Sequence, residues 1–164
     1  MSLRRVSIAC VPFLVSVAGA HACDLAGFKG LEGLRLQPPV PGAVVAGFGM
    51  MKHPLLEVPR FHNGLDFAAA IGEPVKAVAK GQVVFAKPFG EWGNLVRIDH
   101  GDGLATAYGH LNKINVQVGE CVGEGDVIGL AGSTGLAIRV QVHFEVQVLG
   151  KQVDPAPVMA ALPQ

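Results

Sequence analysis

The sequence has little charge, few aromatic residues and few cysteines. Charged residues make up 16% of the 164 residues, and 13 acidic side chains balance 13 basic ones. Without a basic excess or a basic run, the chain has no electrostatic surface of the kind that binds nucleic acid. Its longest apolar run, over 6–17, is too short to span a bilayer as a helix. We therefore expect neither a nucleic-acid partner nor a membrane span in the mature protein.

The first 22 residues have the order of parts of a secretory signal peptide. Two arginines precede the apolar run over 6–17, and small residues in a small-x-small pattern end at Ala20 and at Ala22. A membrane anchor is the alternative, and the shortness of the run argues against it. We predict a signal peptide over 1–22 and export to the periplasm or the cell exterior.

Cysteine is scarce, with three residues in the chain. Cleavage of the signal would remove Cys10 and two of the 13 basic residues, which leaves 11 against 13 acidic ones, a net charge of −2. Cys23 and Cys121 could then pair in an oxidising compartment, although two cysteines alone do not establish a bridge. Lipid modification of Cys23 is less favoured, because Ala20 stands where such sites usually have leucine.

Glycine and proline, in contrast, are abundant, at 22 and 11 residues, and follow no repeating period. Short segments of alternating apolar residues lie between these turn formers, which indicates antiparallel β structure. A short turn near 156–162 is the best helix candidate. We predict one compact all-β antiparallel domain over 42–160, preceded by an irregular arm over 23–41 laid against it. The predicted strands include 74–79, 82–86, 95–99, 104–110, 127–130 and 140–148.

Three strand-like segments carry histidine together with polar neighbours. His62 and Asp66 are four residues apart, so an extended strand would place both on one face, unless Gly64 bends the chain. In the other two segments, the polar residues of each are also expected to share one face of their strand. These sets are Gln141, His143 and Glu145, and Thr106, Tyr108 and His110.

Imidazoles and carboxylates are suitable zinc ligands, and a catalytic zinc site typically uses three protein ligands. The chain has six histidines, however. From the residues alone, unrelated surface or core histidines therefore remain the alternative.

A series of short motifs runs in order along the chain from Phe48 to Pro155. Their order and spacing resemble those of the lysostaphin and LytM-type metallopeptidase domain, which cuts peptides in bacterial cell walls. So many ordered matches are far more specific than a lone motif. The matching segments are 48–49, 53–54, 62–66, 72–77, 81–83, 93–100, 108–111, 116–129 and 132–135.

The resemblance implies a role for each residue at a matching position. His62, Asp66 and His143 would be the ligands of one zinc ion, and His110 a catalytic histidine. The last family motif, His-x-His-Phe-Glu, begins here with Gln141 in place of a second catalytic histidine. A glutamine amide can donate a hydrogen bond but cannot carry a proton as imidazole does.

The loop before that motif departs as well, because residues 137–140 are Ala-Ile-Arg-Val where the family usually has Ser-Thr-Gly-Pro. The sequence is therefore compatible with two functions. The first is a zinc metalloendopeptidase of reduced activity that hydrolyses cross-links or stem peptides of peptidoglycan. The second is an inactive envelope protein that binds peptidoglycan or regulates another cell-wall hydrolase.

For four further residues the sequence favours modest roles or leaves the choice open. His53 and His100 are expected to be structural or to face solvent. Trp92 either lines a peptide groove or packs locally, and Glu145 either orients His143 or lies at the surface.

Overall fold

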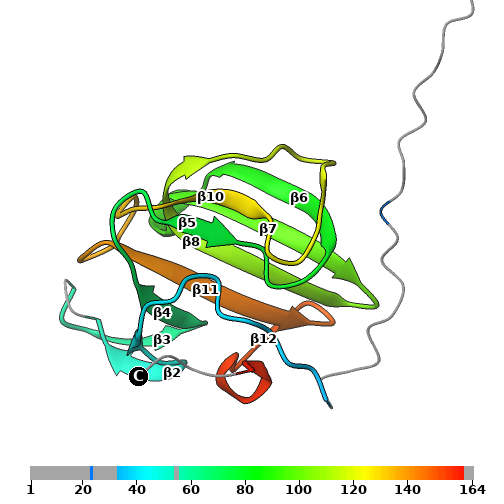
Figure 1. The fold of residues 1–164 in the computed structure, drawn as a ribbon. Coiled ribbons are helices and arrows are strands. Elements are labelled where there is room, and N and C mark those ends of the chain that lie inside the picture. Colours follow the sequence, from blue (N-terminus) through cyan, green and yellow to red (C-terminus); the bar gives the residue numbers. More distant parts are fainter. Residues whose placement is uncertain (1–22, 24–32, 54–55, 161–164) are drawn as a thin grey trace, which may run out of the picture.

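The structure is a computed structural model that describes residues 23, 33–53 and 56–160 (Figure 1). The expected signal peptide over 1–22 lies outside these residues. Within the described part of the chain, no helix has the length and apolar character needed to cross a membrane.

The described chain forms two antiparallel sheets, one of ten strands and one of two strands. The only helical elements in it are two short 3-10 turns, η1 (Gly90–Trp92) and η2 (Ala156–Val158). The prediction of an all-β antiparallel fold is therefore confirmed. The strands are β1 (Val44–Ala46), β2 (Gly49–Lys52), β3 (Pro59–His62), β4 (Leu65–Ala68), β5 (Pro74–Lys76), β6 (Gly81–Pro88), β7 (Asn94–Gly101), β8 (Leu104–Ile114), β9 (Cys121–Val122), β10 (Val127–Ala131), β11 (Gln141–Val148) and β12 (Lys151–Val153).

Strand β11 lies near the middle of the large sheet, between β4 and β8 (Figure 1). The strand order is β1-β4-β11-β8-β7-β6-β9, while β10 pairs with β8 and β5, and β12 pairs with β11. Strands β2 and β3 form a separate hairpin. Because β11 has neighbours on both sides, side chains on each of its faces are held in fixed positions.

The alternation of β11 separates the core from the opposite face of the sheet. Val142, Phe144 and Val146 are fully buried in the apolar core. Phe144 lies opposite Tyr108 of β8, and their ring centroids are 5.4 Å apart. The residues between them in sequence therefore face away from the core, as the period of two requires.

The described part of the arm packs on the domain. Leu36 and Val40 are each 2% exposed and belong to the main core cluster. The backbone of Leu36 is held between two neighbours, since its N–H donates to Val158 and its carbonyl accepts from Ala160. Residues 33–41 of the predicted arm thus cover apolar surface next to η2.

Cys23 and Cys121 form a disulfide, with their Cα atoms 5.6 Å apart. The pairing that the sequence left open is therefore present. It joins the start of the described chain to β9, at one edge of the large sheet.

Candidate functional site

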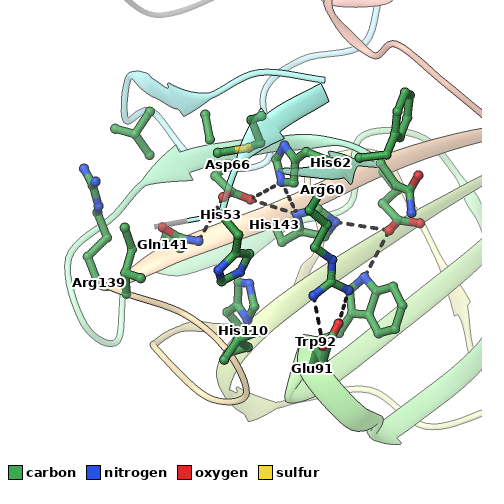
Figure 2. Close-up of a pocket in the computed structure, with 18 residues that line it drawn as sticks. His53, Arg60, His62, Asp66, Glu91, Trp92, His110, Arg139, Gln141 and His143 are labelled. Atoms are coloured by element: carbon green, nitrogen blue, oxygen red, sulfur yellow. Dashed lines mark hydrogen bonds and ion pairs between the residues drawn. The ribbon is translucent and has the colours of Figure 1, made fainter. Parts of the chain in front are cut away.

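A pocket lies on the face of β11 opposite the core (Figure 2). Its wall combines side chains from β3, β4, β8 and β11 with the β2–β3 hairpin, η1 and the loop before β11. All five residues that the sequence assigned to the site line this pocket: His62, Asp66, His110, Gln141 and His143.

Three of these side chains converge on one point. Asp66 Oδ1 lies 2.8 Å from His143 Nδ1 and 3.2 Å from His62 Nε2, and the two nitrogens are 3.1 Å apart. Bonds of about 2.0–2.1 Å from a tetrahedral zinc ion would separate its ligand atoms by roughly 3.3 Å. The three atoms thus form one face of such a tetrahedron, and two imidazoles with one carboxylate are a donor set that suits zinc.

His62 and Asp66 do not lie on one continuous strand, which corrects the simplest form of the sequence prediction. His62 ends β3 in the small sheet, and Asp66 belongs to β4 in the large one. The chain between them passes close over β11. A Cβ on Gly64 would overlap the carbonyl oxygen of Phe144, so only glycine fits there. This close approach brings His62 against His143.

The side chain of His143 is oriented by Glu145, its neighbour on the same face of β11. His143 Nε2 lies 3.1 Å from Glu145 Oε1, and Trp92 Nε1 donates to that same oxygen at 3.0 Å. A carboxylate that accepts from one ring nitrogen directs the lone pair of the other toward a metal. Glu145 is 1% exposed and is not a surface residue. Trp92 both lines the pocket and fixes this carboxylate.

The two neighbouring histidines, His62 and His143, favour the ionised form of Asp66. Burial alone would raise its pKa, but hydrogen bonds from His143 and His62 lower the pKa well below the usual range. For His143, burial would lower the pKa, but hydrogen bonds to Asp66 and Glu145 raise it to about 9.

His110 enters the pocket through an irregularity in β8. His143 lies opposite Gly109 and Phe144 opposite Tyr108, so regular alternation would point His110 into the core. The register between β7 and β8 shifts here, and His110 has a φ of 62°. This bulge turns its side chain to the pocket face. The prediction that Thr106, Tyr108 and His110 share one side is therefore wrong.

The ring of His110 is held in one tautomer. His110 Nδ1 donates to the carbonyl oxygen of Thr134 at 2.9 Å, which leaves Nε2 as an acceptor. Burial, followed by the charge of His143, lowers the pKa of His110, so its ring is neutral at pH 7. Figure 2 shows this ring in the pocket below His143.

Two of the sequence motifs position the Thr134 carbonyl group, which accepts the hydrogen bond from His110. Thr134 Oγ1 accepts from the backbone N–H of Asn94 at 3.0 Å and donates to the carbonyl of Leu111 at 2.7 Å. Asn94 Nδ2 donates to the same Leu111 carbonyl at 2.9 Å. The segments 93–94 and 132–135 thus form one hydrogen-bonded unit behind His110.

Gln141 does not aim its amide at open space in the pocket. Its Nε2 donates to Asp66 Oδ2 at 3.0 Å, and the residue is 5% exposed (Figure 2). The amide thus holds the carboxylate oxygen that does not face the two histidines.

The sequence interpretation did not assign four charged or titratable residues of the pocket wall to the site. Arg60 forms a two-pronged ion pair with Glu91 of η1, through Nη1–Oε1 at 2.9 Å and through Nη2–Oε2. Arg60 and His62 are two residues apart on β3 and therefore share a face. This spacing could have indicated that Arg60 lies in the site. His53 and Arg139 also line the pocket. His53 was expected to be structural or solvent-facing, and Arg139 lies in the loop that departs from the family pattern.

The profile of Peptidase family M23 matches residues 60–155. The chain belongs to this family. It is 39% identical over 112 residues to the peptidoglycan DD-endopeptidase ShyB of Vibrio cholerae, covering 68% of this chain and 26% of that protein. The resemblance seen in the sequence is thereby confirmed.

Solved peptidase structures superpose on the fold. A zinc-containing peptidase from Vibrio cholerae gives a TM-score of 0.67 at 36% identity, covering 79% of this chain and 41% of that one. The catalytic domain of lysostaphin from Staphylococcus simulans gives 0.64 at 35% identity, covering 71% of this chain and 90% of that one. The chain spans 30% or less of the length of the first curated M23 relatives it matches.

Proposed function

We propose that this M23 chain is a zinc metalloendopeptidase that hydrolyses peptide cross-links or stem peptides of bacterial peptidoglycan. The observation that carries the proposal is the convergence of His62 Nε2, Asp66 Oδ1 and His143 Nδ1, within 2.8–3.2 Å of one another, in a pocket. A peptidoglycan substrate is supported by the named activity of the ShyB relative.

His62, Asp66 and His143 would hold the ion. Zinc, when bound, supplies a Lewis acid that activates water and polarises the carbonyl group under attack. The protein's own groups handle the proton. His110 Nε2 is a neutral acceptor in the pocket, so it can take a proton from the attacking water. Once the C–N bond breaks, the same proton can pass to the leaving amine.

The test uses the chain without residues 1–22, measured for zinc content and for release of peptides from purified peptidoglycan. We expect about one zinc per chain and cleavage that a chelator abolishes. His143→Ala should lose both. The control is His100→Asn, because His100 is a buried histidine outside the pocket lining and should be dispensable for zinc binding. Full zinc content in His143→Ala would contradict the assigned ligand set.

A second candidate function is an inactive envelope protein that binds peptidoglycan or regulates another cell-wall hydrolase. The observation that favours it is Gln141, whose amide holds Asp66 and offers no imidazole to the reaction. The same measurements, together with sedimentation of the chain with peptidoglycan, separate the two proposals. A zinc-loaded chain that sediments with peptidoglycan but releases no peptide would support the second candidate.

We also propose that the protein is exported and works in the cell envelope. The small-x-small sites at Ala20 and Ala22 and the Cys23–Cys121 disulfide, which suits an oxidising compartment, support this. The intact mass of protein recovered from the envelope should correspond to a chain that starts at residue 21 or 23. A mass that retains residues 1–17 would indicate an anchor instead.

A further inference from the structure

The pocket contains an imidazole that the family assignment does not use. His53 lies just after β2, at the start of the loop of the β2–β3 hairpin, and lines the same pocket as His110 and His143. We propose that His53 is a second catalytic residue. It would donate a hydrogen bond to the substrate in place of the family's second histidine, whose position Gln141 occupies here. The inference rests on the proposed peptidase function.

The backbone around His53 is well fixed. Its N–H donates to the carbonyl of Val58 at 2.9 Å, and its carbonyl accepts from the N–H of Glu57 at 2.8 Å. These bonds continue the β2–β3 ladder past the Lys52–Pro59 pair. His53 and His110 line the same pocket, and Figure 2 draws the His53 ring within it. The side chain therefore starts from a hydrogen-bonded position just after β2 and lines the pocket.

The tautomer of His53 is complementary to that of His110. The backbone N–H of Leu56 donates to His53 Nδ1 at 3.2 Å, so Nδ1 is an acceptor and the neutral ring carries its proton on Nε2. His110 has the opposite arrangement, with the proton on Nδ1 and a lone pair on Nε2. The pocket thus presents one imidazole donor and one imidazole acceptor.

The hairpin that carries His53 is tied to the opposite wall of the pocket. Arg60 on β3 pairs with Glu91 of η1, and this hydrogen bond holds the pKa of Glu91 below its usual value. Glu91 and Trp92 belong to the same short turn, and Trp92 is bonded to Glu145. A chain of polar contacts therefore connects the His53 hairpin with the strand that holds His143.

Peptide hydrolysis has a use for such a donor. Attack of water on the carbonyl carbon moves negative charge to the carbonyl oxygen, and a preplaced N–H lowers the energy of that state. His53 Nε2–H would donate to this oxygen while His110 Nε2 takes the proton of the attacking water. One N–H of the Gln141 amide donates to Asp66 Oδ2, which holds this amide against the carboxylate, and the side chain offers no imidazole to the reaction.

The test compares zinc-loaded wild type, His53→Gln and a control, Met50→Gln, on a soluble peptidoglycan peptide. Met50 lies on the same hairpin, is 68% exposed and does not line the pocket. We expect His53→Gln to lower kcat on the order of 10²-fold, with little change in KM, zinc content or Tm. Met50→Gln should behave as wild type. Long-range ¹H–¹⁵N NMR should show the proton of His53 on Nε2 in the chain without substrate.

An unchanged kcat in His53→Gln overturns the proposal, and so does a loss explained by lost zinc or a lowered Tm. The double variant His53→Gln/Gln141→His is expected to recover most of the lost kcat, because it returns an imidazole to the pocket. A double variant as slow as His53→Gln also overturns the proposal. If zinc-loaded wild type itself cleaves no peptide, the peptidase function fails and this inference fails with it.

Discussion

Gln141 Nε2 donates a 3.0 Å hydrogen bond to Asp66 Oδ2, while Oδ1 of the same carboxylate faces His62 and His143. The residue at the position of a missing catalytic histidine thus contacts a proposed metal ligand directly. Partners of this kind hold a ligand in its binding orientation. We therefore expect Gln141 to contribute to zinc affinity rather than to proton transfer.

Gln141→Ala should weaken zinc binding by about tenfold, because Asp66 loses the donor that orients it. Competition with a chromophoric chelator measures the affinity. The matched control is Gln147→Ala, at a position further along β11 that does not line the pocket. Equal zinc affinity in Gln141→Ala and wild type would mean that the amide does not position Asp66.

The Cys23–Cys121 disulfide is expected to stabilise the fold. It closes a long loop, with a sequence separation of 98 residues, and so restricts the unfolded chain. Cys121→Ser should lower the free energy of unfolding by about 2–4 kcal/mol. Urea unfolding of the chain without residues 1–22 measures this. Adding reductant to the wild type should reproduce the effect and leave Cys121→Ser unchanged, and a reductant effect on the variant would contradict it.

His100 should make the protein less stable in mild acid. Burial lowers its pKa, although its hydrogen bond to the Lys80 carbonyl opposes this, so the folded state binds a proton less readily than the unfolded chain. Stability is therefore lost as the pH falls below the unfolded value of about 6.5, by at most about 1.4 kcal/mol per pH unit.

Urea unfolding in the presence of a chelator, from pH 8 to pH 5, tests the role of His100. His100→Asn should be less stable than wild type at pH 8, because the buried contacts to Lys80 and Thr106 change. Its stability should nevertheless decline less steeply with falling pH. Parallel declines in the two proteins would contradict the prediction.

The Arg60–Glu91 ion pair should matter more for substrate than for stability. Its side chains are 40% and 47% exposed, and pairs at such positions contribute about 0.2–1 kcal/mol. A double-mutant cycle with Arg60→Gln and Glu91→Gln should give a coupling within that range. We expect KM for the peptide to rise in both single variants, because the hairpin loses its tie to η1. Coupling well above 1 kcal/mol would indicate a structural role instead.

Much of this molecule was predictable from local pattern. The period of two in 140–148 places Gln141, His143 and Glu145 on one face of β11. In the structure all three side chains line the pocket, which confirms this prediction. Alternation is a reliable guide there because β11 is regular and paired on both sides. It failed at His110, where a bulge and a φ of 62° turn the side chain to the other face. Sequence spacing does not reveal such a bulge.

The sequence by itself determined the all-β class, the family, and the candidate set His62, Asp66, His110 and His143. These follow from turn residues, apolar alternation and ordered motifs, which are local properties of the chain. Only the tertiary structure decided that Gln141 contacts Asp66, that Cys23 meets Cys121 and that His53 lines the same pocket as His110. The first two contacts join residues 75 and 98 positions apart. They depend on how strands and hairpins pack in space, which no local pattern records.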